Sequence, residues 1–496
     1  MIWRRLLLIW ALVAASAAAG APLARAPVPP PRPAIPPEAA SARLIAGAGL
    51  TGRVGFVLAD ARTGEVIESV NPDLLLPPAS TIKALTALYA LDSLGAGFRF
   101  RTRVLATGPV TDGRLAGDLI LAGGGDPTLD SDDLARLVRD VTAGGLTKVS
   151  GRFLYFPRAL PEIASIDPRQ PAHVAYNPAL GGLNLNFNRV HFQWQRSASG
   201  WKVTMDAPAL RNRPSVDVAR MRVVDRRGPV YTYADKGGRD DWTVARTALG
   251  DGGSRWLPVR KPGLYAAEAF RALAADAGLA LPAPRRERMP ASATVLAEHV
   301  SEPLAEILRG MLRHSTNVTA ELVGLTASSA RARPPVTSLS GSAARMRRWS
   351  ADRLGVTGLR LADHSGLSDD ARVSPAMMVR VLARVGPDGP LRPLLPERRL
   401  RDERGRPMTV PGIEMRAKTG TLNFVKGLVG YIDARDGRDL VFAIYAADME
   451  RRAAMADPRI ERPRGGRAWL GRAVRLQRAL LRGWVGSYAG PGDPAG

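Results

Sequence analysis

Residues 77–94 read PPASTIKALTALYALDSL, and this stretch places a hydroxyl and an amine at the start of a helix. Two prolines end the preceding extended segment, and from Ser80 onward apolar side chains recur at helical spacing. Ser80 and Lys83 are three residues apart, so a helix puts them on one face within reach of a hydrogen bond. The free N–H groups and the positive dipole at a helix start suit charge on an attacked carbonyl. The stretch therefore predicts a serine nucleophile activated by a lysine.

Lysine is scarce in this chain, which makes each copy informative. The 496 residues contain 63 arginines and seven lysines, at positions 83, 148, 202, 236, 261, 418 and 426. A side chain that must lose and regain a proton near neutral pH cannot be arginine, because the guanidinium stays charged. A desolvated lysine beside another cation can have a much lower pKa. The few lysines are therefore candidates for chemistry.

Two further motifs belong with the first. Lys418-Thr419-Gly420-Thr421 stands at a predicted strand end, and composition alone gives roughly 0.03 copies of Lys-Thr-Gly. The S-x-x-K pattern is weaker, with roughly 0.35 copies expected by chance. Its second copy, at 199–202, lies in a glycine-containing turn among strands and is interpreted as background. Ser315-Thr316-Asn317 lies where a predicted helix over 303–313 stops and another begins at Val318.

Other catalytic and metal-binding patterns are absent from the sequence. Without cysteine there is no disulfide, thiol nucleophile or thiolate metal site. The five histidines show no H-E-x-x-H motif and no i, i+4 pair, and no G-x-S-x-G elbow or P-loop occurs. The glycine-rich run 123–127 lacks the lysine and helix that would cradle a phosphate. We therefore expect neither a metal nor a cofactor.

The two ends of the chain carry matching strand patterns. Residues 54–59 and 65–70 form a predicted hairpin about Thr63-Gly64, and residues 428–434 and 440–446 form another. We expect strands from both ends to share one sheet. Between them lie mixed elements, then short alternating strands, and then helices, a change of character that indicates inserted modules.

Together the motifs resemble the S-x-x-K, S-D-N and K-T-G set of penicillin-binding proteins and β-lactamases. Because 235 residues divide Ser80 from Ser315, the chain is similar to the D-alanyl-D-alanine carboxypeptidase/endopeptidase family, the class C low-molecular-mass penicillin-binding proteins. The resemblance covers about residues 45 to 450. Thr316 stands where Asp or Asn is commoner, and His364 replaces the usual Gly of D-G-S-G-L-S. Further similar stretches are GDPTL at 125–129, YNP at 176–178, PLAEI at 303–307, DHSGLS at 363–368 and AKTGTLN at 417–423.

The resemblance implies an α/β fold. A serine β-lactamase/transpeptidase-like domain, with an antiparallel sheet flanked by helices, is interrupted by two nested, strand-rich inserted domains. The expected divisions are a signal peptide (1–19), a Pro-rich linker (20–40), the first transpeptidase-like segment (41–100), the first segment of an inserted mixed α/β domain (101–183), a nested β-rich domain (184–250), the return of the inserted domain (251–290) and the second transpeptidase-like segment (291–490).

The resemblance also implies a role for each motif residue. Ser80 would attack a D-Ala-D-Ala or cross-bridge peptide bond, Lys83 would take its proton, and water would release the acyl-enzyme. Ser315 would relay a proton to the leaving amine, and Asn317 would hold the substrate amide and Lys83. Lys418 would provide a positive field for the substrate carboxylate, which the Thr419 and Thr421 hydroxyls would bind, with Gly420 between them. The N–H groups of Ser80 and Thr421 would form the oxyanion hole.

The net charge of the chain bears on its possible binding partners, and its amino-terminal residues bear on the cell compartment in which it works. The net charge is +24, which suits an anionic partner without identifying it. Arg4 and Arg5 precede a short apolar run that ends in small residues up to Ala19, a pattern typical of a cleaved export signal. We therefore expect a periplasmic or extracytoplasmic enzyme that acts on peptidoglycan peptides, is inhibited by β-lactams and binds no nucleic acid. The carboxy-terminal helix over 467–484 is expected to pack on the sheet rather than to lie on a membrane.

Two other functions fit the same motifs. A β-lactamase would use the same site but would hydrolyse the drug quickly, and a catalytically silent wall-binding scaffold would not be acylated. The balance of carboxypeptidase and endopeptidase activity, the peptide preference and the oligomeric state do not follow from the residues.

Overall fold

The computed structural model describes residues 40–331, 334–433, 437–455, 460–461 and 463–487. The expected signal peptide lies outside the described residues, as does the expected linker up to residue 39. Within the described ranges, no helix has the length and apolar character needed to cross a membrane.

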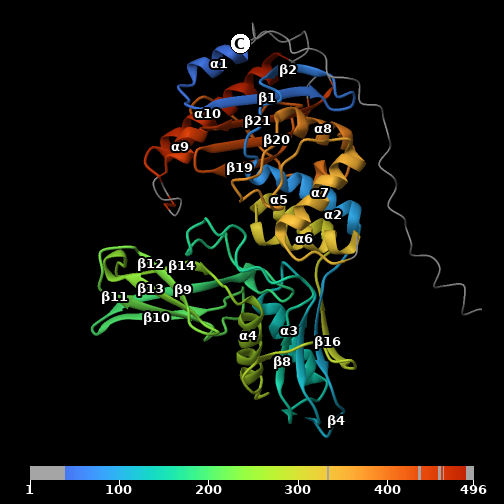
Figure 1. The fold of residues 1–496 in the computed structure, drawn as a ribbon, viewed down its shortest axis with the longest axis vertical. Helices are drawn as coiled ribbons and strands as arrows, with labels where there is room; N and C mark the ends of the chain where they lie inside the picture. The colour runs from blue at the N-terminus through green and yellow to red at the C-terminus, as the bar shows by residue number, and fades with distance from the viewer. Residues whose placement is uncertain (1–39, 332–333, 434–436, 456–459, 462, 488–496) are drawn as a thin grey trace, which may run out of the picture.

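A five-stranded antiparallel sheet joins the two ends of the chain, in the order β19-β20-β21-β1-β2 (Figure 1). Its central contact is between β1 and β21, where Val57 is opposite Ala443. The sheet expected from the two hairpin patterns is therefore present. The strands are β1 (Arg53–Asp60), β2 (Val66–Val70), β19 (Met415–Leu422), β20 (Val425–Asp433) and β21 (Asp439–Ala447).

Alternation along β1 gives the sheet two buried faces. Phe56 and Leu58 pack on one side with Trp469 and Trp484 of α10 (Gly466–Ser487), near α1 (Ala40–Gly47). The carboxy-terminal helix therefore packs on the sheet, as expected. Val57 and Ala59 belong to the core on the other side. The helices there are α2 (Lys83–Leu94), α5 (Leu304–His314), α6 (Asn317–Arg331), α7 (Leu339–Leu354) and α8 (Pro375–Val385).

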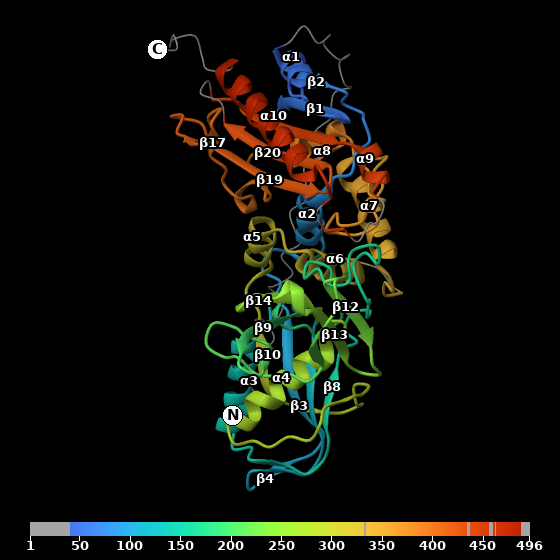
Figure 2. The same cartoon turned by 90° about the vertical axis from the view of Figure 1, so that its left-hand side faces the viewer.

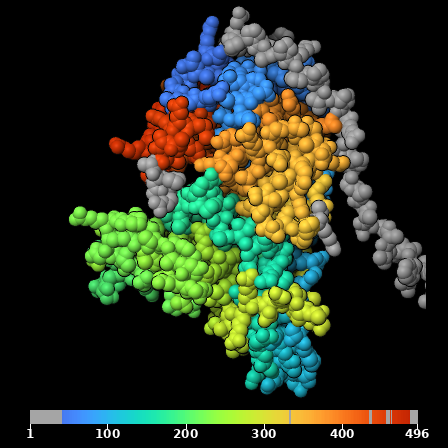
Figure 3. All heavy atoms as spheres, viewed as in Figure 1, coloured from blue at the N-terminus to red at the C-terminus, as the bar shows by residue number. Residues whose placement is uncertain are grey.

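Between α2 and α5 the chain leaves this body and builds a second one below it (Figures 2 and 3). Its larger sheet has the order β15-β8-β6-β3-β16 and packs with α3 (Ser131–Ala143) and α4 (Pro262–Asp276). The strands are β3 (Arg101–Ala106), β6 (Leu119–Gly123), β8 (Phe153–Phe156), β15 (Arg285–Arg286) and β16 (Thr294–Val300), and a small accessory sheet contains β4 (Val110–Thr111), β5 (Arg114–Leu115) and β7 (Lys148–Val149).

A strand-rich module is nested within this body as two three-stranded sheets. One has the order β10-β9-β14 and the other the order β11-β13-β12. The strands are β9 (Arg189–Ser197), β10 (Gly200–Asp206), β11 (Ala219–Val224), β12 (Tyr231–Asp235), β13 (Asp240–Ala245) and β14 (Gly252–Pro258).

Strand pairing revises two of the expected divisions. The boundary at 250 would separate β14 from β9, yet the two strands pair along their length, so the nested module extends to Pro258. The boundary at 290 would assign β16 to the sheet-bearing body, but β16 pairs with β3. The inserted module therefore returns at about Val300. Both pairings join distant segments, which local sequence patterns do not reveal.

Candidate active site

Ser80 lies at a tight turn that leads into helix α2. Residues Ala79–Ile82 form a 3-10 turn, η1, which leads directly into α2. Ala79 has φ 46, a left-handed conformation that is uncommon for a residue with a side chain. Ala79 is fully buried whereas Ser80 is partly exposed. The turn therefore presents the Ser80 hydroxyl at the surface of an otherwise closed core.

Close backbone approach explains the glycine in the Lys-Thr-Gly motif. A Cβ atom added at Gly420 would lie 2.7 Å from the Pro78 carbonyl oxygen, a distance that real Cβ atoms do not reach. Strand β19 can therefore pass beside the Ser80 turn only with glycine at this position. We expected the motif to end its strand, but β19 continues to Leu422.

Lys83 lies beneath Ser80 and joins two of the motifs. Its side chain is fully buried, and Nζ donates to Ser80 Oγ at 2.8 Å and to Asn317 Oδ1 at 2.8 Å. A third bond runs from Nζ to the Ser365 carbonyl oxygen at 2.7 Å. Burial lowers the pKa of Lys83 to about 7, although the carboxyl groups of Glu321 and Asp363 oppose this shift. The amine can therefore exchange a proton near neutral pH.

The Ser315-Thr316-Asn317 motif connects α5 to α6. Ser315 has φ 58, and this left-handed residue ends α5, while α6 begins at Asn317. Asn317 Nδ2 donates to the Tyr176 carbonyl oxygen at 3.0 Å, which attaches the inserted module to the site. The Thr316 hydroxyl donates to Thr319 Oγ1 in the first turn of α6 at 2.8 Å, so this departure from the family pattern is accommodated by a local contact.

Lys418 connects the Lys-Thr-Gly motif to the Ser315-Thr316-Asn317 motif. Nζ donates to Ser315 Oγ at 2.8 Å and to the Thr419 carbonyl oxygen at 2.8 Å. Burial, together with the nearby charges of Lys83, Arg398 and Lys426, lowers the pKa of Lys418 to about 6. Thr419 is partly exposed and Thr421 is exposed, so both residues are accessible to a ligand. All eight predicted residues thus gather around the Ser80 turn.

Two buried carboxyl groups support Lys83 and were not predicted from the sequence. Glu321 of α6 accepts the backbone N–H groups of His364 and Ser365 at 3.0 and 2.8 Å, one on each oxygen. Asp363 accepts the N–H groups of Gly366 and Ser368 at 2.6 and 2.7 Å. Burial raises the pKa of both acids. These two acids hold the 363–368 loop so that the Ser365 carbonyl faces Lys83. In the sequence, the DHSGLS motif at 363–368 was the pattern that could have indicated this loop.

His364 does not face the site. Its ring is fully buried, Nε2 lies 2.7 Å from Ser342 Oγ on α7, and burial lowers its pKa to about 3, so it is neutral. A Cβ atom at Gly324 would lie 2.2 Å from the ring. The histidine therefore occupies space that Gly324 leaves on α6, and this departure alters the helical core rather than the catalytic groups.

Lys426 and Arg398 also lie at the site without having been predicted. Lys426 is opposite Thr421 in the β19–β20 pair, and its Nζ donates to Thr421 Oγ1 at 2.9 Å. Arg398 follows the outer edge of β19, where its N–H donates to the Met415 carbonyl at 2.8 Å. The scarcity of lysine in the sequence was the feature that could have indicated a functional role for Lys426.

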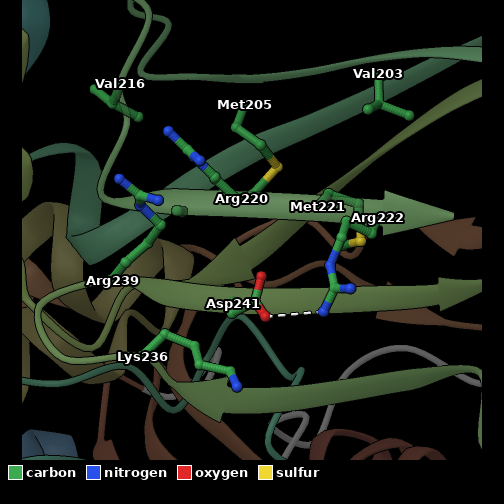
Figure 4. Close-up of a pocket in the computed structure, with 10 residues that line it drawn as sticks. Val203, Met205, Val216, Arg220, Met221, Arg222, Lys236, Arg239 and Asp241 are labelled. Carbon is green, nitrogen blue, oxygen red and sulfur yellow. Dashed lines mark hydrogen bonds and ion pairs between the residues drawn. The ribbon is translucent and has the colours of Figure 1, made fainter.

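A separate hollow of about 560 Å³ lies in the nested module (Figure 4). Met205 and Met221 contribute apolar surface, Lys236 and Arg239 are cationic, and Arg222 pairs with Asp241 at 3.0 Å. None of the predicted site residues lines it. In the part of the chain that the structure describes, no group of three His, Asp or Glu side chains is arranged to hold a metal ion.

Comparison with known proteins agrees with the geometry. The model of the D-Ala-D-Ala carboxypeptidase 3 (S13) family matches residues 40–461. A carboxypeptidase of Mycobacterium tuberculosis is 30% identical over 455 residues, which are 84% of this chain and 85% of that protein. A D-alanyl-D-alanine carboxypeptidase of Actinomadura sp. is 28% identical over 441 residues, 79% of this chain and 77% of that protein. The solved penicillin binding protein 4 of Haemophilus influenzae has a TM-score of 0.71 at 20% identity and covers 90% of this chain and 99% of its own. This likeness confirms the predicted fold class.

Proposed function

Because this chain belongs to the D-Ala-D-Ala carboxypeptidase 3 (S13) family and is a serine DD-peptidase, we propose that Ser80 is the residue its substrate acylates. The observation that carries this assignment is the contact of Lys83 Nζ with Ser80 Oγ at 2.8 Å, beside a partly exposed hydroxyl. A neutral Lys83 amine accepts the serine proton as Ser80 Oγ bonds to the carbonyl carbon.

The second half of acylation needs a proton donor. Ser315, bonded to Lys418, relays to the departing amine the proton that Lys83 took from Ser80, as the C–N bond breaks. Lys83 is then neutral again, Ser315 keeps its hydroxyl, and the acyl group remains as an ester on Ser80. Asn317, bonded to Lys83, holds the substrate amide beside the nucleophile. Water then hydrolyses the ester with Lys83 as base, which regenerates the serine. Backbone N–H groups of Ser80 and Thr421 bind the oxyanion, and such donors contribute about 3 to 4 kcal/mol each.

The substrate of this mechanism is a peptidoglycan peptide, and its carboxylate is bound by Thr419 and Thr421 beside Gly420 and Lys418. A β-lactam carries a comparable carboxylate and acylates the same serine. A complex of the Haemophilus influenzae penicillin binding protein 4 with a β-lactam supports inhibitor binding at such a fold.

We place the enzyme outside the cytoplasm, on the pattern of residues 4–19 and on the wall substrate. Sequencing the amino terminus of the mature protein from a wall or periplasmic fraction tests this location. A chain that keeps residue 1 and stays in the cytoplasm contradicts it.

Labelling with a fluorescent penicillin tests the site. We expect a lasting label on the wild type and none on Ser80→Ala. Ser199→Ala, which alters the exposed serine of the second S-x-x-K copy, is the matched control and should label normally. A transient label would indicate a β-lactamase, and an unlabelled wild type would indicate a silent scaffold.

A further inference from the structure

Three basic side chains lie near the exposed end of β19. Lys426 of β20 is opposite Thr421 and lies on the same face of the β19–β20 pair as Thr421, whereas Lys418 lies on the other face. Arg398 follows the outer edge of β19, where its Nε donates to the Ala417 carbonyl at 3.3 Å. Lys426 Nζ is fixed on Thr421 Oγ1 at 2.9 Å. Of the seven lysines in this arginine-rich chain, three therefore belong to one site: 83, 418 and 426.

No carboxylate balances this cluster within the described ranges. None of Lys418, Lys426 and Arg398 forms an ion pair there. Burial, together with the charge of Arg398, lowers the pKa of Lys426 to about 8. Partly buried cations without a counter-charge are unfavourable in the free protein, and an arriving anion relieves that cost.

The hydrogen bond between Lys426 and Thr421 has a direction that matters for a ligand. Because the ammonium donates, the Thr421 oxygen accepts, and the threonine hydroxyl hydrogen is left free to donate elsewhere. Thr421 is exposed, so that hydrogen can point to a bound group. An anion at this position gains both an oriented donor and a positive charge behind it.

We propose that Lys426, acting through Thr421 and supported by Arg398, selects for a charged carboxylate on the residue that leaves during acylation, by orienting the Thr421 hydroxyl towards that carboxylate and placing a positive charge behind it. This inference rests on the proposed function, because it places the carboxylate beside an acylated Ser80. Lys426 is a positioning and specificity residue, and it takes no proton from the substrate.

The test compares a penicillin with its methyl ester, which differs by loss of the carboxylate charge. Acylation rate constants for both compounds are measured by intact mass on wild type, Lys426→Met and Lys426→Arg. We expect Lys426→Met to slow acylation by the acid about tenfold, the factor typical of one charge-assisted hydrogen bond, and acylation by the ester less than twofold. Lys426→Arg should retain most of the preference for the acid.

Lys236→Met is the matched control, since it removes an exposed lysine from the nested module. It should change neither rate. Equal losses of both rates in Lys426→Met would mean a structural role and would overturn the proposal, as would no loss at all. If Lys426→Met does not fold, Lys426→Gln replaces it under the same criteria. A wild type that neither compound labels would instead refute the proposed function.

Discussion

Replacing Lys83 with arginine separates positive charge from the ability to lose a proton. The Lys83 amine is fully buried, lies 2.8 Å from Ser80 Oγ and has its pKa lowered by burial to about 7. Near neutral pH a large share of molecules therefore holds a neutral amine. An arginine guanidinium stays protonated at any pH at which the protein is folded. We expect Lys83→Arg to lose acylation.

The size of the loss follows from the surroundings of Ser80. A general base contributes typically 10²- to 10⁴-fold. Lys83 is the titratable side chain that hydrogen-bonds the Ser80 hydroxyl, and the described residues provide no second one. The loss should therefore fall in the upper part of that range, about 10³- to 10⁴-fold, or about 4 to 5.5 kcal/mol of activation free energy.

The assay is the second-order rate constant of acylation by penicillin, with thermal unfolding measured on the same samples. Lys83→Met is a second variant that removes base and charge together, and it should lose acylation to the same extent. Lys202→Arg makes the same substitution in the second S-x-x-K copy and should be silent. A folded Lys83→Arg enzyme that acylates within tenfold of the wild type would refute the role of the amine.

Three further predictions concern the same core. Because the neutral form of Lys83 is the base, acylation by penicillin should accelerate as pH rises from about 6 to about 8; a constant or falling rate across this window would contradict the assignment. Glu321→Gln leaves one acceptor oxygen where two accept N–H groups, so we expect denaturant unfolding to show a loss of about 1 to 3 kcal/mol, with slower acylation. A variant as stable and as fast as the wild type would show that the loop does not need Glu321. Gly324→Ala places a methyl group 2.2 Å from the His364 ring, which should cost about 1 to 3 kcal/mol by thermal unfolding. His364→Gly in the same chain should recover much of that loss, and additive effects would disprove the steric explanation.

The sequence predicted those parts of the site that short patterns define. Ser80 and Lys83 share one helical turn, and the order of the other two motifs indicated a single centre, which agrees with the bonds from Lys83 to Asn317 and from Lys418 to Ser315. The shared sheet was also foreseeable, because both ends of the chain carry hairpin patterns. The chemical roles of these residues remain predictions.

What the sequence did not reveal depends on register and on loop closure. Lys426 reaches Thr421 because the two residues are opposite each other in the paired strands β19 and β20. No local sequence pattern distinguishes this register from one shifted along the strands. Glu321 matters because a loop more than forty residues later returns its N–H groups to that carboxylate. The boundaries near 250 and 290 failed for the same reason, since β14 and β16 pair with strands far back in the chain.

The junction between the two bodies explains how motifs 235 residues apart can meet. The chain leaves α2 and returns to α5 through two segments joined by backbone bonds, from Leu304 to Phe98 at 2.8 Å, from Ala305 to Ala96 at 3.0 Å and from Ser301 to Phe100 at 3.0 Å. Because these bonds close the insertion where it begins, the α2–α5 contact does not depend on what lies between. The entropy of closing a long connection grows only with the logarithm of its length, and the inserted module folds around its own core. The Ser80 turn and the Ser315 junction are therefore held by the packing of α2, α5 and α6, while the insertion contributes the Tyr176 carbonyl that anchors Asn317.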